Sequence, residues 1–84
     1  MAVILVTGSS TGIGQEAALH MARKGHQVYA AVRNPATATE LREKIAAESL
    51  PAEIIRLDLV DPASIATAVG EIMARSGRID ALVN

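Results

Sequence analysis

The sequence predicts an α/β fold, in which a doubly wound parallel sheet carries helices on both faces. Short apolar runs alternate with segments of helical spacing along the whole chain. This alternation gives the element order β-α-β-α-β-α-β and right-handed crossovers between parallel strands. A glycine-rich turn, Gly8 to Gly14, also follows the first apolar run directly, where a strand would pass into a helix. No linker or repeat divides the 84 residues, so we expect one unit over residues 1–84.

The first half of the chain supplies two strands and a helix. Residues Val3–Thr7 form a continuous apolar run, which is typical of a strand buried on both faces. Residues Ile13–Lys24 are predicted to be helical, and Gly25 supplies the helix stop. Small and apolar side chains recur there at helical spacing, at Ile13, Ala17, Ala18, Met21 and Ala22. Residues Gln27–Val32 predict the second strand.

A second helix and a third strand follow. Thr37 and Glu40 have the spacing of a capping box, which predicts a helix start at Thr37. An apolar stripe continues that helix, at Ala38, Leu41, Ile45 and Ala46. Pro51 ends the region, and residues Glu53–Leu57 predict the third strand.

The last helix has clear boundaries in the sequence. Asp61 is placed to cap it, with Pro62 at its first position, and Ser76-Gly77 ends it. Its apolar positions repeat at helical spacing, at Ile65, Ala68, Val69, Ile72 and Met73. Residues Ala81–Val83 begin a fourth strand. Because three helices serve four strands, we expect that strand to be an uncovered apolar edge and the isolated chain to be marginally stable and to self-associate.

Composition excludes several classes of function. The formal net charge of −1 gives no basic surface for nucleic acid, and the absence of cysteine excludes disulfides and thiolate metal sites. No apolar run reaches the roughly 18 residues of a membrane span, and the N-terminus lacks the basic residues of a signal peptide. We therefore expect a cytoplasmic protein. His20 and His26 are expected to be structural, because no cysteine or carboxylate cluster accompanies them, and no metal ligands are predicted.

The glycine turn has the features of a phosphate-binding site. Gly8 lets the chain leave the strand sharply, Gly12 lets backbone N–H groups approach a pyrophosphate, and Gly14 lets the helix pack close to the strand. The helix N-terminus adds partial positive charge, and hydroxyl donors are available at Ser9, Ser10 and Thr11. A Walker phosphate loop is excluded, because no Gly-Lys-Ser/Thr follows. The alternative is a tight turn without a ligand.

The spacing of this turn resembles that of the short-chain dehydrogenase/reductase family, in its compact single-domain branch. The resemblance covers the whole chain and rests on Thr7 to Gly14, on Arg33 after the second strand, on Asp58 in Leu57-Asp58-Leu59, and on residues 79–84. The segment Ile79-Asp80-Ala81-Leu82-Val83-Asn84 is similar to the approach to the family's Asn-Asn-Ala-Gly motif, cut after its first Asn. The resemblance implies a Rossmann-type sheet and the N-terminal, cofactor-binding half of a longer enzyme.

The same resemblance implies a nicotinamide cofactor and its binding residues. NAD-selective members place an acid where this chain has Val32, followed by Arg33, whose guanidinium suits a 2′-phosphate; this favours NADP over NAD. The alternative for Arg33 is a solvated loop residue, and Thr11 stands where many NADP-selective relatives have a second basic residue. Asp58 is expected beside the adenine, the alternative being a turn or cap residue. The predicted cofactor-binding residues are Thr7, Gly8, Ser9, Ser10, Thr11, Gly12, Ile13, Gly14, Arg33, Asp58, Leu59 and Asn84.

The family's catalytic groups have no counterpart in these 84 residues. The resemblance implies a Tyr general acid, a Lys four residues later, an orienting Ser and a further Asn, all beyond Asn84. Tyr29-x-x-x-Arg33 imitates this pattern, but Tyr29 lies on a predicted strand and is expected to pack in the core. No catalytic residue is therefore predicted. The favoured function is the NADP(H)-binding part of a reductase that acts on a carbonyl or alcohol. The alternatives are a non-catalytic dinucleotide-binding module and an inactive truncated remnant.

Overall fold

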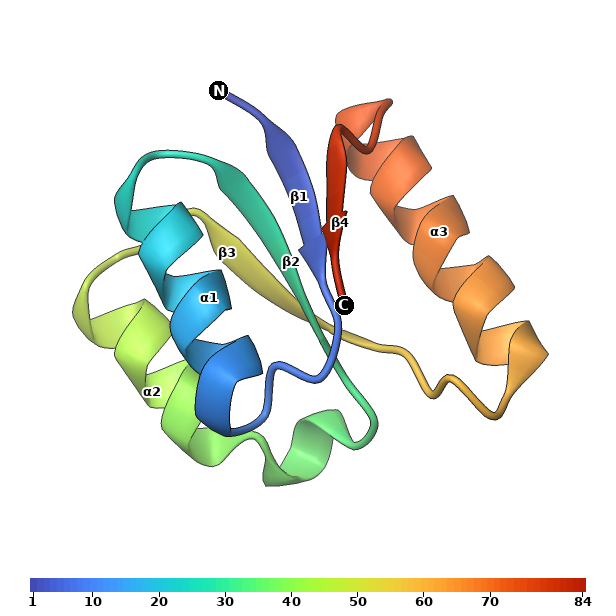
Figure 1. The fold of residues 1–84 in the computed structure, drawn as a ribbon, viewed down its shortest axis with the longest axis horizontal. Helices are drawn as coiled ribbons and strands as arrows, with labels where there is room; N and C mark the ends of the chain where they lie inside the picture. The colour runs from blue at the N-terminus through green and yellow to red at the C-terminus, as the bar shows by residue number, and fades with distance from the viewer.

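Four parallel strands form the centre of the structure, in the order β3-β2-β1-β4 (Figure 1). The computed structural model describes all of residues 1–84. The strands are β1 (Val3–Val6), β2 (Gln27–Val32), β3 (Ala52–Arg56) and β4 (Ala81–Val83). The predicted doubly wound parallel sheet of Rossmann type is confirmed, with all its strand pairs parallel.

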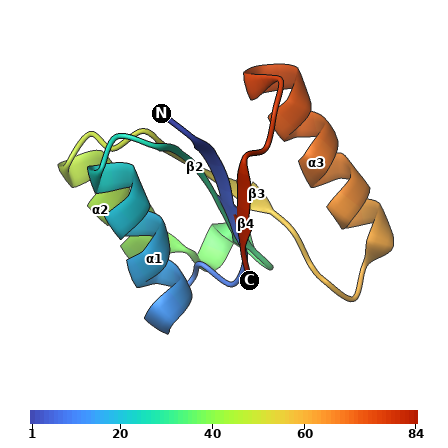
Figure 2. The same cartoon turned by 45° about the horizontal axis from the view of Figure 1, so that its top comes forward.

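Helices cover the sheet on both faces (Figure 2). The helices are α1 (Gly12–Arg23), α2 (Thr39–Ala47) and α3 (Pro62–Ser76), with a short 3₁₀ helix, η1 (Pro35–Thr37), before α2. In both views α1 and α2 lie together on one side of the sheet and α3 lies alone on the other. None of these helices has the length and apolar character that a bilayer crossing requires.

Alternating side chains of the central strands divide the core into two apolar layers. Along β2, Val28 and Ala30 belong to the layer beneath α1 and α2, whereas Tyr29 and Ala31 belong to the layer beneath α3. All four residues of β1 are buried, as predicted for a central strand of a parallel sheet. Tyr29 is 2% exposed, and its hydroxyl lies 2.6 Å from Oγ of Ser76 on α3. The predicted packing role of Tyr29 is confirmed.

The start of the second helix was predicted wrongly. Thr37 belongs to η1 and its hydroxyl donates to the carbonyl oxygen of Asn34, so it does not form a capping box with Glu40. The helix α2 begins at Thr39, with Ala38 in the cap position and no side-chain cap bond. The physical reason lies upstream, where the Asn34 side chain caps η1 by accepting from the Ala36 N–H.

The boundaries of α3 agree with the prediction, but its buried face is narrower. Asp61 caps the helix through Oδ1 and the Ala63 N–H, and Gly77 ends it at φ +73°. Ala68 and Ile72 are buried, as expected, but the stripe's other members are not all covered, because α3 is alone on this side of the sheet. Exposed fractions are 37% for Val69, 46% for Met73 and 59% for Leu82 on β4. The edge position predicted for the fourth strand is confirmed.

Asp80 ties the edge strand β4 to β1. Its carboxylate oxygen Oδ2 accepts from the Val3 N–H at 2.7 Å and from Nε of Arg78 at 2.9 Å, and its own N–H donates to the Val3 carbonyl. The Val3 N–H bond, followed by the Arg78 guanidinium, holds the pKa of the Asp80 carboxyl below its ordinary value. These bonds set the register that places the end of β4 beside the end of β1.

Candidate functional site

The predicted site residues gather at the carboxyl edge of the sheet. The turn after β1, the residue after β2 and the loop after β3 all open onto this edge, where parallel α/β sheets bind ligands. Two adjacent hollows of about 370 and 470 Å³ lie there. Both hollows are lined by Thr7, Gly8 and Leu59; the first adds Ser10, Arg33, Leu57, Asp58 and Val60, and the second adds Ile13, Gly14, Ala17, Val83 and Asn84.

The turn requires glycine for two geometric reasons, which are a left-handed backbone conformation and a close approach of the helix. Gly8 and Gly12 have φ of +61° and +59°, in the left-handed region that favours glycine, and the space beside their Cα atoms is open. A Cβ on Gly14 would overlap the carbonyl oxygen of Gly8 and lie 2.7 Å from its carbonyl carbon. The start of α1 therefore rests directly on the turn, as the sequence predicted for Gly14.

The backbone of this turn presents free hydrogen-bond donors. The N–H groups of Gly8 and of residues 10–14 donate to no acceptor within the chain. They surround the N-terminus of α1, where the helix dipole adds partial positive charge. Free N–H groups, open glycine Cα positions and a helix N-terminus together fit a pyrophosphate. The main chain of the turn therefore fits the phosphates of a dinucleotide.

Ser9 differs from the hydroxyl donors beside it. Its side chain is fully buried, and Oγ donates to the Val6 carbonyl at 2.7 Å. Its N–H donates to the Ala31 carbonyl at 3.0 Å. The expected hydroxyl donation from Ser9 to a ligand is corrected accordingly, because the hydroxyl hydrogen binds the end of β1, while the Ser9 N–H binds β2. Ser10 and Thr11 are exposed, and the Thr11 side chain makes no cap hydrogen bond.

Gln15 was not singled out from the sequence, although it braces the turn. It is 4% exposed, its Nε2 donates to the Ser10 carbonyl at 3.0 Å, and its Oε1 accepts from Nζ of Lys44 at 3.2 Å. The buried face of α1 differs from the predicted one. Ile13 is 90% exposed, and the buried residues are Gln15, Ala18, Leu19 and Ala22. The spacing of Gln15 to Ala18, Leu19 and Ala22 was the available signal, since it places a polar side chain on the inward face.

Arg33 adds a positively charged side chain to the lining of the first hollow. It follows β2, is exposed, and lines the hollow with Gly8, Ser10 and Asp58. The other arginines of the chain hydrogen-bond or form ion pairs with protein oxygens, whereas no such contact holds the Arg33 guanidinium. A guanidinium with all its donors available fits a phosphate monoester in the same hollow.

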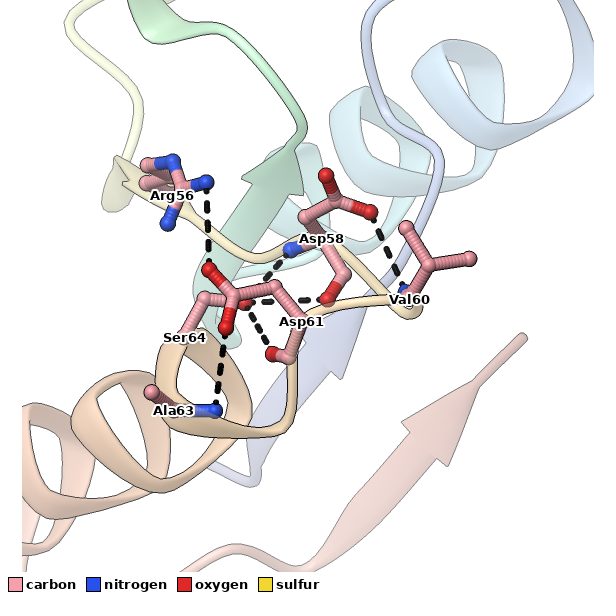
Figure 3. A network of polar contacts seen from close by, with 6 residues as sticks. All are labelled: Arg56, Asp58, Val60, Asp61, Ala63 and Ser64. Carbon is pink, nitrogen blue, oxygen red and sulfur yellow. Dashed lines mark hydrogen bonds and ion pairs between the residues drawn. The ribbon is translucent and has the colours of Figure 1, made fainter.

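Asp58 makes a turn contact and also lines the first hollow (Figure 3). Its Oδ1 accepts from the Val60 N–H at 3.1 Å, which is a turn contact. Its Oδ2 has no partner within the chain, and the residue lines the first hollow. Leu59 and Val60, which follow it, are 61% and 88% exposed and give this hollow an apolar wall.

Thr7 and Asn84 close the other side of the edge. The Thr7 hydroxyl donates to Oδ1 of Asn84 at 2.6 Å, and the Thr7 N–H donates to the Val83 carbonyl at 2.9 Å. The structure thus brings together around two hollows all the predicted residues except Ser9, which lies beneath the turn, and Thr11 and Gly12, which lie on the exposed turn beside them.

Comparison with known proteins agrees with this geometry. The chain matches the short chain dehydrogenase family over residues 2–84. It is 42% identical over 84 residues to an uncharacterized oxidoreductase of Schizosaccharomyces pombe, covering 98% of this chain and 25% of that protein. It is 32% identical over 84 residues to retinol dehydrogenase 12 of Mus musculus, covering 98% of this chain and 27% of that protein. This chain belongs to the short-chain dehydrogenase family.

Solved structures of the family superpose closely on the chain. Menthone neomenthol reductase from Mentha piperita gives a TM-score of 0.90 at 35% identity, covering 99% of this chain and 30% of that one. A metagenomic short-chain oxidoreductase in complex with NADP gives 0.86 at 31% identity, covering 96% and 37%. The chain spans about a quarter to a third of the length of the curated relatives that it matches. The family match and these superpositions show that its site belongs to a dinucleotide-binding fold.

Proposed function

We propose that residues 1–84 form the NADP(H)-binding part of a short-chain reductase that interconverts a carbonyl and an alcohol. The observation that carries the proposal is the unpartnered Arg33 guanidinium beside the free N–H groups of the glycine turn. When bound, the nicotinamide cofactor supplies or accepts the hydride. The matching relatives are three to four times as long as this chain, which supports a catalytic Ser and a Tyr-x-x-x-Lys pair elsewhere in a longer protein.

In this proposal each part of the site holds one part of the cofactor. The N–H groups of Gly8 and residues 10–14 bind the pyrophosphate, and the helix α1 contributes its dipole. Arg33 binds the 2′-phosphate of the ribose, and no acidic side chain is in the Val32 position to repel that charge. Asp58 and Leu59 contact the base, and Ile13 and Asn84 line the second hollow on the side of the nicotinamide. The chain's own residues thus bind and orient the cofactor.

The charge of Arg33 gives the proposal its sharpest test. We expect Arg33→Ala to weaken NADPH binding about 10- to 100-fold, the range for hydrogen bonds to a charged group, and to leave NADH binding nearly unchanged. The measurement is the ratio of the two dissociation constants by calorimetric titration. Arg75→Ala is the matched control, because Arg75 pairs with Glu53 away from both hollows. An unchanged NADPH/NADH ratio in Arg33→Ala would contradict NADP selectivity.

A further inference from the structure

Ser64 places a buried hydroxyl where α3 begins, beneath the loop that leads into the site. It is 5% exposed, and its Oγ accepts from the Asp58 N–H at 2.9 Å (Figure 3). The hydroxyl hydrogen lies within reach of two carbonyl oxygens, that of Asp58 at 2.9 Å and that of Asp61 at 2.8 Å. One side chain therefore contacts both polar groups of the Asp58 backbone.

These contacts leave Asp58 little freedom. On its N-terminal side, the Leu57 N–H donates to the Val32 carbonyl at 2.9 Å and fixes the loop to β2. On its C-terminal side, the Asp61 N–H donates to the Asp58 carbonyl at 2.9 Å, and Asp61 caps α3. The Val60 N–H binds Oδ1 of Asp58, so the remaining oxygen, Oδ2, has no partner within the chain, at a residue that lines the first hollow.

We propose that Ser64 is a positioning residue for the base of the cofactor, holding Asp58 so that Oδ2 accepts a hydrogen from an exocyclic amino group on a purine. The inference rests on the proposed dinucleotide binding and adds a residue that does not itself touch the ligand. Removing the hydroxyl would leave the half-buried Asp58 N–H without its acceptor. The loop would then relax around Asp58, and the carboxylate would lose its fixed direction.

The test compares NADP with its deamino analogue, in which hypoxanthine replaces adenine, on the complete protein. Hypoxanthine lacks the amino donor and presents a carbonyl oxygen to the carboxylate. We expect the unmodified protein to bind NADP about tenfold more tightly than the analogue, since a hydrogen bond to a charged group contributes on this scale. In Ser64→Ala this ratio falls toward one, whereas Ser64→Thr, which keeps the hydroxyl, restores it.

A merely structural role would weaken both ligands equally and leave the ratio unchanged. Ser76→Ala is the matched control on the same helix, because its hydroxyl pairs with Tyr29 away from the hollows. Ser64→Cys provides a second variant if Ser64→Ala folds poorly, and its weaker hydrogen bonds predict an intermediate ratio. An unchanged ratio in Ser64→Ala, or equal binding of the two ligands by the unmodified protein, overturns the inference alone. Failure of the unmodified protein to bind either ligand contradicts the proposed function as well.

Discussion

Gly14 shows how one missing side chain holds the site together. A Cβ at this position would overlap the Gly8 carbonyl, so α1 and the turn would have to separate. We expect Gly14→Ala to lower the free energy of unfolding by about 1–3 kcal/mol, the usual cost of overpacking, despite the better helix propensity of alanine. Urea unfolding measures this loss.

Gly70 provides the control for this substitution. It lies within α3, and nothing surrounds the position that a Cβ would take. Gly70→Ala is therefore expected to stabilise the protein by up to about 1 kcal/mol. Equal effects at the two positions would mean that the close approach of α1 to the turn is not what requires glycine at position 14.

At the same scale, single side chains explain where sequence interpretation succeeded and where it failed. The need for glycine at positions 8, 12 and 14 was predictable, because a strand that turns directly into a helix requires sharp turns and a close approach. The inward hydroxyl of Ser9 was not, since its acceptor at Val6 depends on how the turn folds back on the sheet. Gln15 was missed for a similar reason, because its partner Lys44 is on α2.

At the scale of elements, the attachment of β4 depends on the ionised Asp80. Its pKa is depressed in the folded protein by the Val3 N–H and then by Arg78, so its contribution to stability is present above the ordinary pKa of aspartate. That contribution is lost as the pH falls through the depressed folded value. We expect Asp80→Asn to lower stability at neutral pH and to flatten its decline in acid.

Urea unfolding midpoints from neutral pH into the acid range test this expectation. Glu43→Gln is the control, because Glu43 is an exposed residue of α2 without an ion pair. An acid profile of Asp80→Asn parallel to that of the unmodified protein would show that another carboxylate dominates. Glu48 is the first alternative, since its pKa is depressed by its hydrogen bonds with Arg23.

Element boundaries illustrate a related difference between local and distant signals. The range of β2 was predicted correctly because its apolar run is bounded by Gly25 on one side and by Asn34-Pro35 on the other. The start of α2 was predicted wrongly because two helix starts compete within a few residues, and the cap at Asn34 produces η1 first. The partial exposure of α3 could not be predicted from its own sequence either, because it depends on how many helices cover that face of the sheet.

At the scale of the whole molecule, the 84-residue chain has an uncovered apolar edge. Leu82 on β4 and Val69 and Met73 on α3 are exposed, and α3 is alone on its side of the sheet. We expect the isolated chain to self-associate through this edge, because the outer side of an edge strand has unpaired backbone groups, and apolar neighbours favour its pairing with another copy. Leu82→Lys is expected to lower the association measured by sedimentation equilibrium, whereas Thr67→Lys, exposed elsewhere on α3, leaves it unchanged. A monomeric unmodified chain would contradict this expectation.

The proposed dinucleotide site joins the glycine turn, Arg33 and Asp58 at the carboxyl edge of the sheet. The most direct measurement is a titration of the isotope-labelled protein with NADPH, followed by the amide signals in NMR spectra. We expect shifts concentrated at the free N–H groups of residue 8 and residues 10–14, at Arg33 and at residues 58–60. Absence of shifts, or shifts confined to the opposite edge around Glu53 and Arg75, would contradict it.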